Sequence, residues 1–75
     1  MLTAFVQGFP PDLTRHVKVL LPSVPGFTSM EEFHYIDNTA SFLCSFEETD
    51  LAEVRDFFAD VFPDVAFEVK EVIKL

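Results

Sequence analysis

Cys44 and His34 are the two side chains whose types could support covalent chemistry, because a thiolate activated by a histidine base is a common nucleophile. They fall on two neighbouring predicted strands, residues 32–36 and 40–46. A single cysteine within an apolar strand is, however, typical of a packed core residue. The second histidine, His16, is isolated, and one cysteine cannot form a thiolate cluster or an internal disulfide. The sequence therefore predicts a binding module and not an enzyme, with no cofactor and no metal.

Acidic side chains gather in the second half of the chain. Seven acids and one base, Arg55, lie within residues 47–64. Glu53, Asp56 and Asp60 are spaced so that a helix would place them on one face. Such a face can be a plain solvated surface, or it can dock a basic partner through electrostatic steering. These three residues are the candidates for protein docking.

Thirteen acids against five bases give the chain a formal net charge of −8. Nucleic-acid binding draws much of its affinity from Lys and Arg side chains that neutralise phosphates, and anionic membranes attract the same side chains. No apolar run approaches the roughly 20 residues that span a bilayer. We therefore expect a protein partner with basic groups, weak or absent RNA binding and no membrane contact. The net charge does not indicate the oligomeric state.

The apolar pattern predicts a folded chain. Hydrophobic residues make up 49% of the sequence, which includes ten Phe, and such a composition argues against disorder. Alternation of apolar and polar residues predicts strands over residues 3–7, 32–36, 40–46 and 65–70.

Two helices are predicted between these strands from apolar residues at helical spacing. The first is expected to be capped by Asp12 or Thr14, and the second by Thr49 or Asp50. A proline follows each apolar stripe and ends the helix.

This order of strand, helix, strand, strand, helix, strand is that of the α+β ferredoxin-like fold, βαββαβ. Right-handed crossovers would place both helices on one face of a four-stranded antiparallel sheet. The other face of the sheet would then stay open to a partner. A chain of 75 residues has room for one such domain, residues 1–75, and we expect it to be cut from a larger multidomain protein.

Two segments resemble the RNA-recognition motif (RRM), whose strands carry aromatic side chains that stack on bases. Residues 4–9 (Ala-Phe-Val-Gln-Gly-Phe) are similar to its first-strand pattern and place Phe5 at the exposed aromatic position. Residues 38–45 stand where its third-strand pattern belongs, and there Phe42 keeps a stacking position. The resemblance implies an RRM-like fold in which RNA contacts on the open face would come from Phe5, Gln7, Tyr35 and Phe42.

The register of the third strand decides whether Phe42 can have that role. In one register Phe42 and Phe46 face outward. A shift by one residue places both of them in the core and exposes Leu43 instead. The sequence is compatible with both registers.

The middle of the chain has a narrower resemblance, to the RRM-like domain of the nuclear RNA export factors (the TAP family). It rests on residues 23–28 (Ser-Val-Pro-Gly-Phe-Thr), on Phe33-His34-Tyr35, and on Asn38 with the strand that follows. The resemblance implies a role in mRNA transport and a nuclear or nucleocytoplasmic location.

The resemblance and the net charge of −8 together favour an atypical, acidic RRM-like module that acts mainly by docking to protein, with RNA binding weak or lost. Two alternatives stay open. One is a domain that binds single-stranded RNA weakly by stacking bases on aromatic side chains of the sheet. The other is a free-standing acidic inhibitor that mimics nucleic acid.

Overall fold

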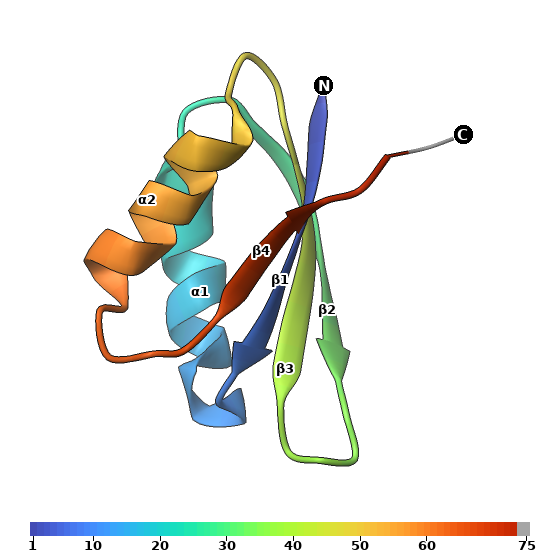
Figure 1. Ribbon diagram of the computed structural model, residues 1–75, viewed down its shortest axis with the longest axis vertical. Coiled ribbons are helices and arrows are strands. Elements are labelled where there is room, and N and C mark those ends of the chain that lie inside the picture. The colour runs from blue at the N-terminus through green and yellow to red at the C-terminus, as the bar shows by residue number, and fades with distance from the viewer. Residues whose placement is uncertain (74–75) are drawn as a thin grey trace.

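The computed structural model describes residues 1–73. The main elements are β1 (Leu2–Phe9), α1 (Thr14–Leu20), β2 (Phe27–His34), β3 (Ala40–Phe46), α2 (Leu51–Val61) and β4 (Glu68–Glu71). A short 3₁₀ turn lies on each side of α1, at Pro11–Leu13 and Leu21–Ser23. The sheet has the order β2-β3-β1-β4 with every pair antiparallel, and both helices lie on one side of it (Figure 1). The predicted ferredoxin-like βαββαβ fold is confirmed.

The core lies between the sheet and the helices and is built mainly from aromatic rings. Phe9, at the end of β1, is at its centre. The centroid of its ring lies 5.7 Å from that of Phe42, 5.6 Å from that of Phe58 and 5.2 Å from that of Phe62. Phe9, Phe42 and Phe58 are fully buried. Edge-to-face contacts of this kind add to the free energy gained by removing the rings from water.

The pairing of β1 with β3 settles the register of β3. Val6 pairs with Phe42 and Ala4 with Cys44, and all four side chains are fully buried. The prediction that Phe42 lies on the open face is therefore wrong. The physical reason is the alternation within β3, where every second residue from 40 to 46 is apolar and the residues between them include two serines. Leu43 takes the outward position.

The helices confirm one predicted cap and contradict the other. Asp50 precedes α2, and its side chain accepts a hydrogen bond from the backbone N–H of Glu53 at 2.9 Å. Neither Asp12 nor Thr14 caps α1, because the preceding 3₁₀ turn runs straight into the helix and leaves Leu13 at the cap position. A turn with its own backbone hydrogen bonds replaces the side-chain cap there.

The two edge strands are shifted from their predicted positions. β2 starts at Phe27 and ends at His34, so Tyr35 follows the strand instead of belonging to it. β4 starts at Glu68, and residues 65–67 run from α2 toward the sheet without strand pairing. Both shifted strands lie at an edge of the sheet and pair with one neighbour only. The alternation of apolar and polar residues is therefore fixed by one set of backbone hydrogen bonds instead of two.

Thr14 allows a test of packing at the start of α1. Its side chain is buried, and its hydroxyl Oγ1 has no hydrogen-bond partner among the described residues. Replacing Thr14 with Val, which has nearly the same shape, is expected to raise the free energy of unfolding by about 1 kcal/mol, measured by urea denaturation. The matched change Thr28→Val removes an exposed hydroxyl that donates to the Ser45 carbonyl at 3.0 Å. A gain of the same size there would contradict this explanation.

Candidate functional site

The face of the sheet opposite the helices presents an apolar patch, made of Phe5, Phe33 and Leu43. The three residues come from β1, β2 and β3 in that order. Phe5 pairs with Leu43, and the rings of Phe5 and Phe33 approach each other across β3 with their centroids 6.4 Å apart. Phe33 is 37% exposed, and the other two side chains are half-buried. The helices leave this patch uncovered.

The charged groups beside the apolar patch are mainly acidic. Gln7 Nε2 donates to Glu68 Oε2 at 2.8 Å, and Lys70 Nζ lies 3.4 Å from the same carboxylate oxygen. These contacts hold the pKa of Glu68 below its usual value, and the hydrogen bond from Gln7 has the larger effect. Lys70 is the only Lys or Arg that the described strands place on this face. Glu31, which pairs with Leu43, adds a second carboxylate.

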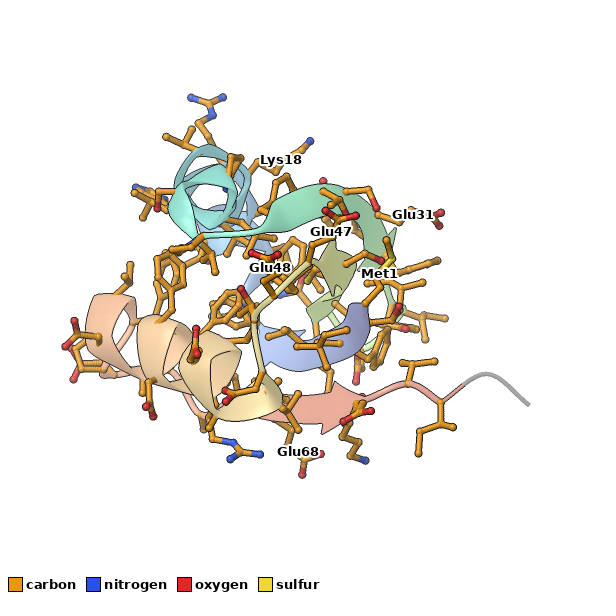
Figure 2. The ribbon with its side chains drawn as sticks, turned by 90° about the horizontal axis from the view of Figure 1, so that it is seen from above. Met1, Lys18, Glu31, Glu47, Glu48 and Glu68 are labelled. Carbon is orange, nitrogen blue, oxygen red and sulfur yellow. The ribbon has the colours of Figure 1, made fainter. Side chains whose placement is uncertain are left out.

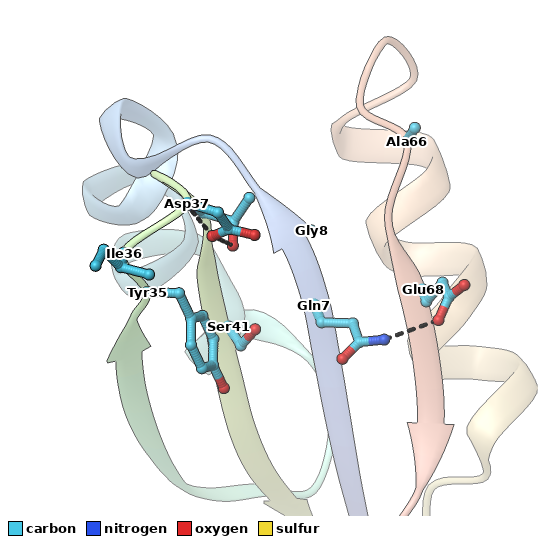
Figure 3. Close-up of a pocket in the computed structure, with 9 residues that line it drawn as sticks. Gln7, Gly8, Tyr35, Ile36, Asp37, Ser41, Ala66 and Glu68 are labelled. Atoms are coloured by element: carbon cyan, nitrogen blue, oxygen red, sulfur yellow. Dashed lines mark hydrogen bonds between the residues drawn. The ribbon is translucent and has the colours of Figure 1, made fainter.

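A hollow of about 670 Å³ continues the open face beyond the end of β2 (Figure 3). The β2–β3 turn, the end of β1 and the segment that leads into β4 form its wall. Its lining residues are Gln7, Gly8, Tyr35, Ile36, Asp37, Thr39, Ser41, Ala66 and Glu68. Tyr35 stands on one side, Gln7 and Glu68 on the other, and Ser41 between them (Figure 3).

Hydrogen bonds fix the turn that carries Tyr35 and Asp37. The backbone N–H of Tyr35 donates to the Thr39 carbonyl at 2.9 Å, and that of Asn38 donates to the Tyr35 carbonyl at 3.1 Å. Asn38 has a positive φ of 65°, which asparagine tolerates better than most residues. Asp37 Oδ1 accepts hydrogen bonds from the backbone N–H and the hydroxyl of Thr39 at 3.2 and 2.7 Å. The Asp37 carboxylate and the backbone of Tyr35 are thereby held at the hollow.

The open face brings together most of the residues that were predicted to contact RNA. Phe5 belongs to the apolar patch, and Gln7 and Tyr35 line the hollow. Phe42 is separated from them, because it lies in the core on the other side of the sheet.

Sequence reasoning missed Ser41 and Glu68 as residues of this face. Both depend on strand pairing: Ser41 pairs with Gln7 on β1 and with Phe33 on β2, and Glu68 pairs with Gln7 from the other side. The alternation of β3 held a signal for Ser41, since an inward Phe42 requires an outward Ser41. The alternation of residues 65–70 held the same signal for Glu68, since an inward Val69 requires an outward Glu68. Its pairing with Gln7 in particular required the register of β4 against β1.

The predicted docking residues Glu53, Asp56 and Asp60 are exposed on α2, on the helix side of the sheet. Together with Phe57 and Ala59 they line a shallow depression of about 530 Å³. None of the three acids forms an ion pair with a described residue. The three acids therefore share one surface of α2, which lies on the other side of the sheet from the open face.

Negative charge surrounds the molecule and does not mark a single face. Figure 2 shows Glu47 and Glu48 in the loop before α2, Glu31 on β2 and Glu68 on β4, with Lys18 on α1. A phosphate chain that approaches the sheet from its end or from either edge therefore meets carboxylates.

Cys44 and His34 do not form the nucleophile pair that the sequence allowed. Met30 lies opposite Cys44 on β2, whereas His34 lies opposite Ala40 at the far end of the same ladder. Cys44 is fully buried, and this burial raises the pKa of its thiol to about 12. The reactive thiolate is therefore scarce at neutral pH.

His34 instead belongs to a small ionic network with Glu32 and Lys18. Glu32 points to the helix side of β2, where Lys18 Nζ on α1 lies 2.9 Å from its Oε1 and the His34 ring contacts its Oε2. Hydrogen bonds from His34 and then from Lys18 lower the pKa of Glu32. The network ties the edge strand β2 to α1.

The Cys44 thiol is expected to be unreactive while the protein is folded. An aromatic disulfide reagent should modify it about a hundredfold more slowly in buffer than in denaturing urea, because the reaction needs both thiolate and access. The measurement is the absorbance of the released aromatic thiol at mildly alkaline pH. Equal rates in the two solutions would mean that Cys44 is accessible in the folded chain, contrary to its burial.

Comparison with family models, curated proteins and solved structures finds no match to this chain. Within residues 1–73, no helix combines the length and the apolar composition needed to cross a membrane. The open face itself is therefore the basis for assigning a function.

Proposed function

We propose that this chain is an acidic RRM-like module that docks a basic protein partner on the open face of its sheet, with RNA binding weak or lost. The observation that carries the proposal is the uncovered apolar patch of Phe5, Phe33 and Leu43, with carboxylates beside it. Apolar and aromatic side chains at the centre of a contact, with charged groups around them, are typical of protein interfaces.

The same face is poorly suited to a phosphate chain. An RRM stacks bases on aromatic rings and attracts phosphates with cations. Here Leu43, which has no aromatic face, stands at the centre of β3 because Phe42 is directed into the core. Lys70, the one cation of the described strands on this face, lies 3.4 Å from a Glu68 oxygen. Stacking contributes about 1–3 kcal/mol per base, and a net charge of −8 opposes it.

The proposal includes a relationship to the nuclear RNA export factors and, with it, a nuclear or nucleocytoplasmic location. This part rests on the sequence resemblance of residues 23–28 and of Phe33-His34-Tyr35. In the structure the second segment ends β2 and leads into the hollow. Retention of the segment beside the open face is consistent with a module whose ligand has changed from RNA to protein.

The acidic face of α2 is a second surface for a basic partner. Glu53, Asp56 and Asp60 would attract such a partner, but the half-buried Phe57 is the apolar group beside them. Interfaces draw most of their affinity from a few apolar or aromatic anchors. The open face offers three such anchors from adjacent strands, which is why we assign docking to it.

Titration of the isotope-labelled full chain with two ligand pools tests the proposal. One pool is mixed-sequence single-stranded RNA, and the other is short peptides rich in basic and aromatic residues. Backbone amide shifts are followed at two salt concentrations. We expect the peptide pool to shift the amides of Phe5, Phe33 and Leu43, and the RNA pool to leave them unchanged.

Two double variants distinguish docking on the open face of the sheet from docking on α2. Phe5→Ser with Phe33→Ser should abolish the peptide-induced shifts, whereas Asp56→Asn with Asp60→Asn should preserve them. The reverse pattern would move docking to α2 and overturn the choice of the open face. If the RNA pool shifts amides of the sheet and the Phe5→Ser, Phe33→Ser variant abolishes these shifts, the alternative of base stacking would be supported. The proposal that RNA binding is weak or lost would then be wrong.

A further inference from the structure

We propose that the hollow at the end of the open face binds an arginine side chain of the docking partner. The inference rests on the proposed function, because the arginine is taken to belong to the protein that covers the apolar patch. Its basis is the chemistry of the lining, which combines a tyrosine ring, two carboxylates, an amide oxygen and the hydroxyl of Ser41. No Lys, Arg or His is among the lining residues.

The two carboxylates reach the hollow from different elements, and each keeps one oxygen free for a ligand. Asp37 lies in the β2–β3 turn and uses Oδ1 for both bonds from Thr39. Glu68 lies on β4 and uses Oε2 for both Gln7 and Lys70. The remaining oxygens, Asp37 Oδ2 and Glu68 Oε1, have no hydrogen bond to a described residue. A cation with several N–H donors could donate a hydrogen bond to each of these two free oxygens.

Ser41 is an independent sign that the hollow is built for a polar ligand. It lies on β3 between Tyr35 and Gln7 (Figure 3), and it is 2% exposed. Its hydroxyl forms no hydrogen bond with a described residue, and the Gln7 side chain uses only Nε2, which leaves the amide oxygen available. Ser41 as a whole is buried, but its hydroxyl oxygen is accessible from the hollow, since Thr14 Oγ1 is the one fully buried side-chain polar atom without a partner among the described residues. A ligand with several N–H donors that enters the hollow can therefore donate both to the Ser41 hydroxyl and to the Gln7 amide oxygen.

The arrangement of these groups favours arginine over lysine. A guanidinium group is flat, carries five N–H donors and stacks on aromatic faces, whereas an ammonium group is a compact charge with three donors. Tyr35, which is 47% exposed, offers a ring on one side of the hollow. Glu68 and Gln7 accept on the opposite side. A flat cation between them would gain cation–π and hydrogen-bond contacts together.

The hollow and the apolar patch are continuous, which restricts the partner further. Ser41 pairs with Phe33 across the β2–β3 ladder, so the floor of the hollow adjoins the patch. In an extended segment, residues two apart point to the same side. The partner segment that fits is therefore an extended one with an arginine and an aromatic residue two positions apart.

The test uses four peptides of one design. The first is the capped peptide Gly-Arg-Ser-Phe-Gly. In the second and third, citrulline or lysine replaces the arginine, and in the fourth, alanine replaces the phenylalanine. Amide shifts of the labelled full chain give the dissociation constants. We expect the arginine peptide to bind about tenfold more tightly than the citrulline peptide, which has the same shape without the charge. The shifts should include the Gly8 and Ser41 amides and the Gln7 side-chain amide.

Variants of exposed residues locate the arginine. Glu68→Gln and Tyr35→Leu should each weaken binding of the arginine peptide about tenfold and leave binding of the citrulline peptide unchanged. Asp56→Asn on α2 is the matched control and should change neither. The amide spectrum of each variant verifies that it is folded.

The outcomes separate this inference from the proposed function. Equal affinity for the arginine and citrulline peptides would overturn the arginine site, while shifts at Phe5 and Phe33 would still support docking on the patch. An arginine preference that survives both Glu68→Gln and Tyr35→Leu would also overturn it. A preference that depends on Glu68 but not on Phe5 or Phe33 would support the arginine site and count against docking on the patch.

Discussion

Replacing Phe9 with Ala is expected to unfold the protein or leave it barely stable. Phe9 is fully buried and touches aromatic rings from β3, from α2 and from the chain after α2. Removing a buried Phe side chain costs about 3–5 kcal/mol, because the cavity cannot close completely. A chain of 75 residues has a total stability of only about 4–11 kcal/mol. One side chain therefore accounts for a large part of the free energy of folding.

Urea denaturation followed by circular dichroism measures this effect. Phe33→Ala is the matched control, because it removes the same side chain from the open face, where Phe33 is 37% exposed. Its expected loss is about 1 kcal/mol. Similar losses for the two variants would mean that Phe9 is not the centre of the core.

Replacing Gly26 with Ala is expected to be the most damaging change outside the core, with a loss of about 3 kcal/mol or more. Gly26 has a φ of +84°, which residues with a side chain rarely adopt, and an added Cβ would lie 1.8 Å from the Glu47 carbonyl oxygen. The same pair is joined by a hydrogen bond from the Glu47 N–H to the Gly26 carbonyl at 2.7 Å. Alanine would therefore push apart the backbone where β2 begins and β3 ends.

Gly8→Ala is the comparison for this prediction. Gly8 also has a positive φ, of +94°, but its Cβ would lie 3.1 Å from the Ala66 carbonyl oxygen, in the unpaired segment before β4. That segment can move by a few tenths of an ångström, so the expected loss is the conformational strain of about 1–2 kcal/mol. A larger loss for Gly8→Ala than for Gly26→Ala, in the same urea experiment, would contradict the contact geometry at Gly26.

The order of elements followed from the sequence because several local signals agreed in each of them. α2 shows this best: the Asp50 cap, the buried Val54 and Phe58 and the terminating proline all predict the same helix. Helical spacing from Val54 and Phe58 would also direct Val61 inward, but Val61 is 36% exposed and Phe62 is buried instead. The chain leaves helical geometry at Phe62, so the helical period no longer determines which residue points inward.

The candidate site was less predictable because it is made by pairing between distant segments. Phe5 could be placed from alternation within β1, whereas Phe42 could be placed either way until β1 was paired with β3. Tyr35 was expected within a strand, but it lies in the turn after β2, where it lines the hollow. The contact between Gln7 and Glu68 joins residues far apart in the sequence, and no local pattern encodes such a pairing.

The ion pair between Glu32 on β2 and Lys18 on α1 affects whether a second copy of the chain can pair with this sheet. β2 is an outer strand of eight residues, and its free backbone groups could accept a strand from another copy. A charged side chain that points inward from an edge strand makes such an addition costly, because the incoming strand would cover the charge and remove it from water. Glu32 is therefore expected to oppose pairing of a second copy along β2, the longer of the two edge strands. The two surfaces therefore differ in what they favour: the apolar patch favours contact with apolar groups, whereas the β2 edge disfavours pairing with a further strand.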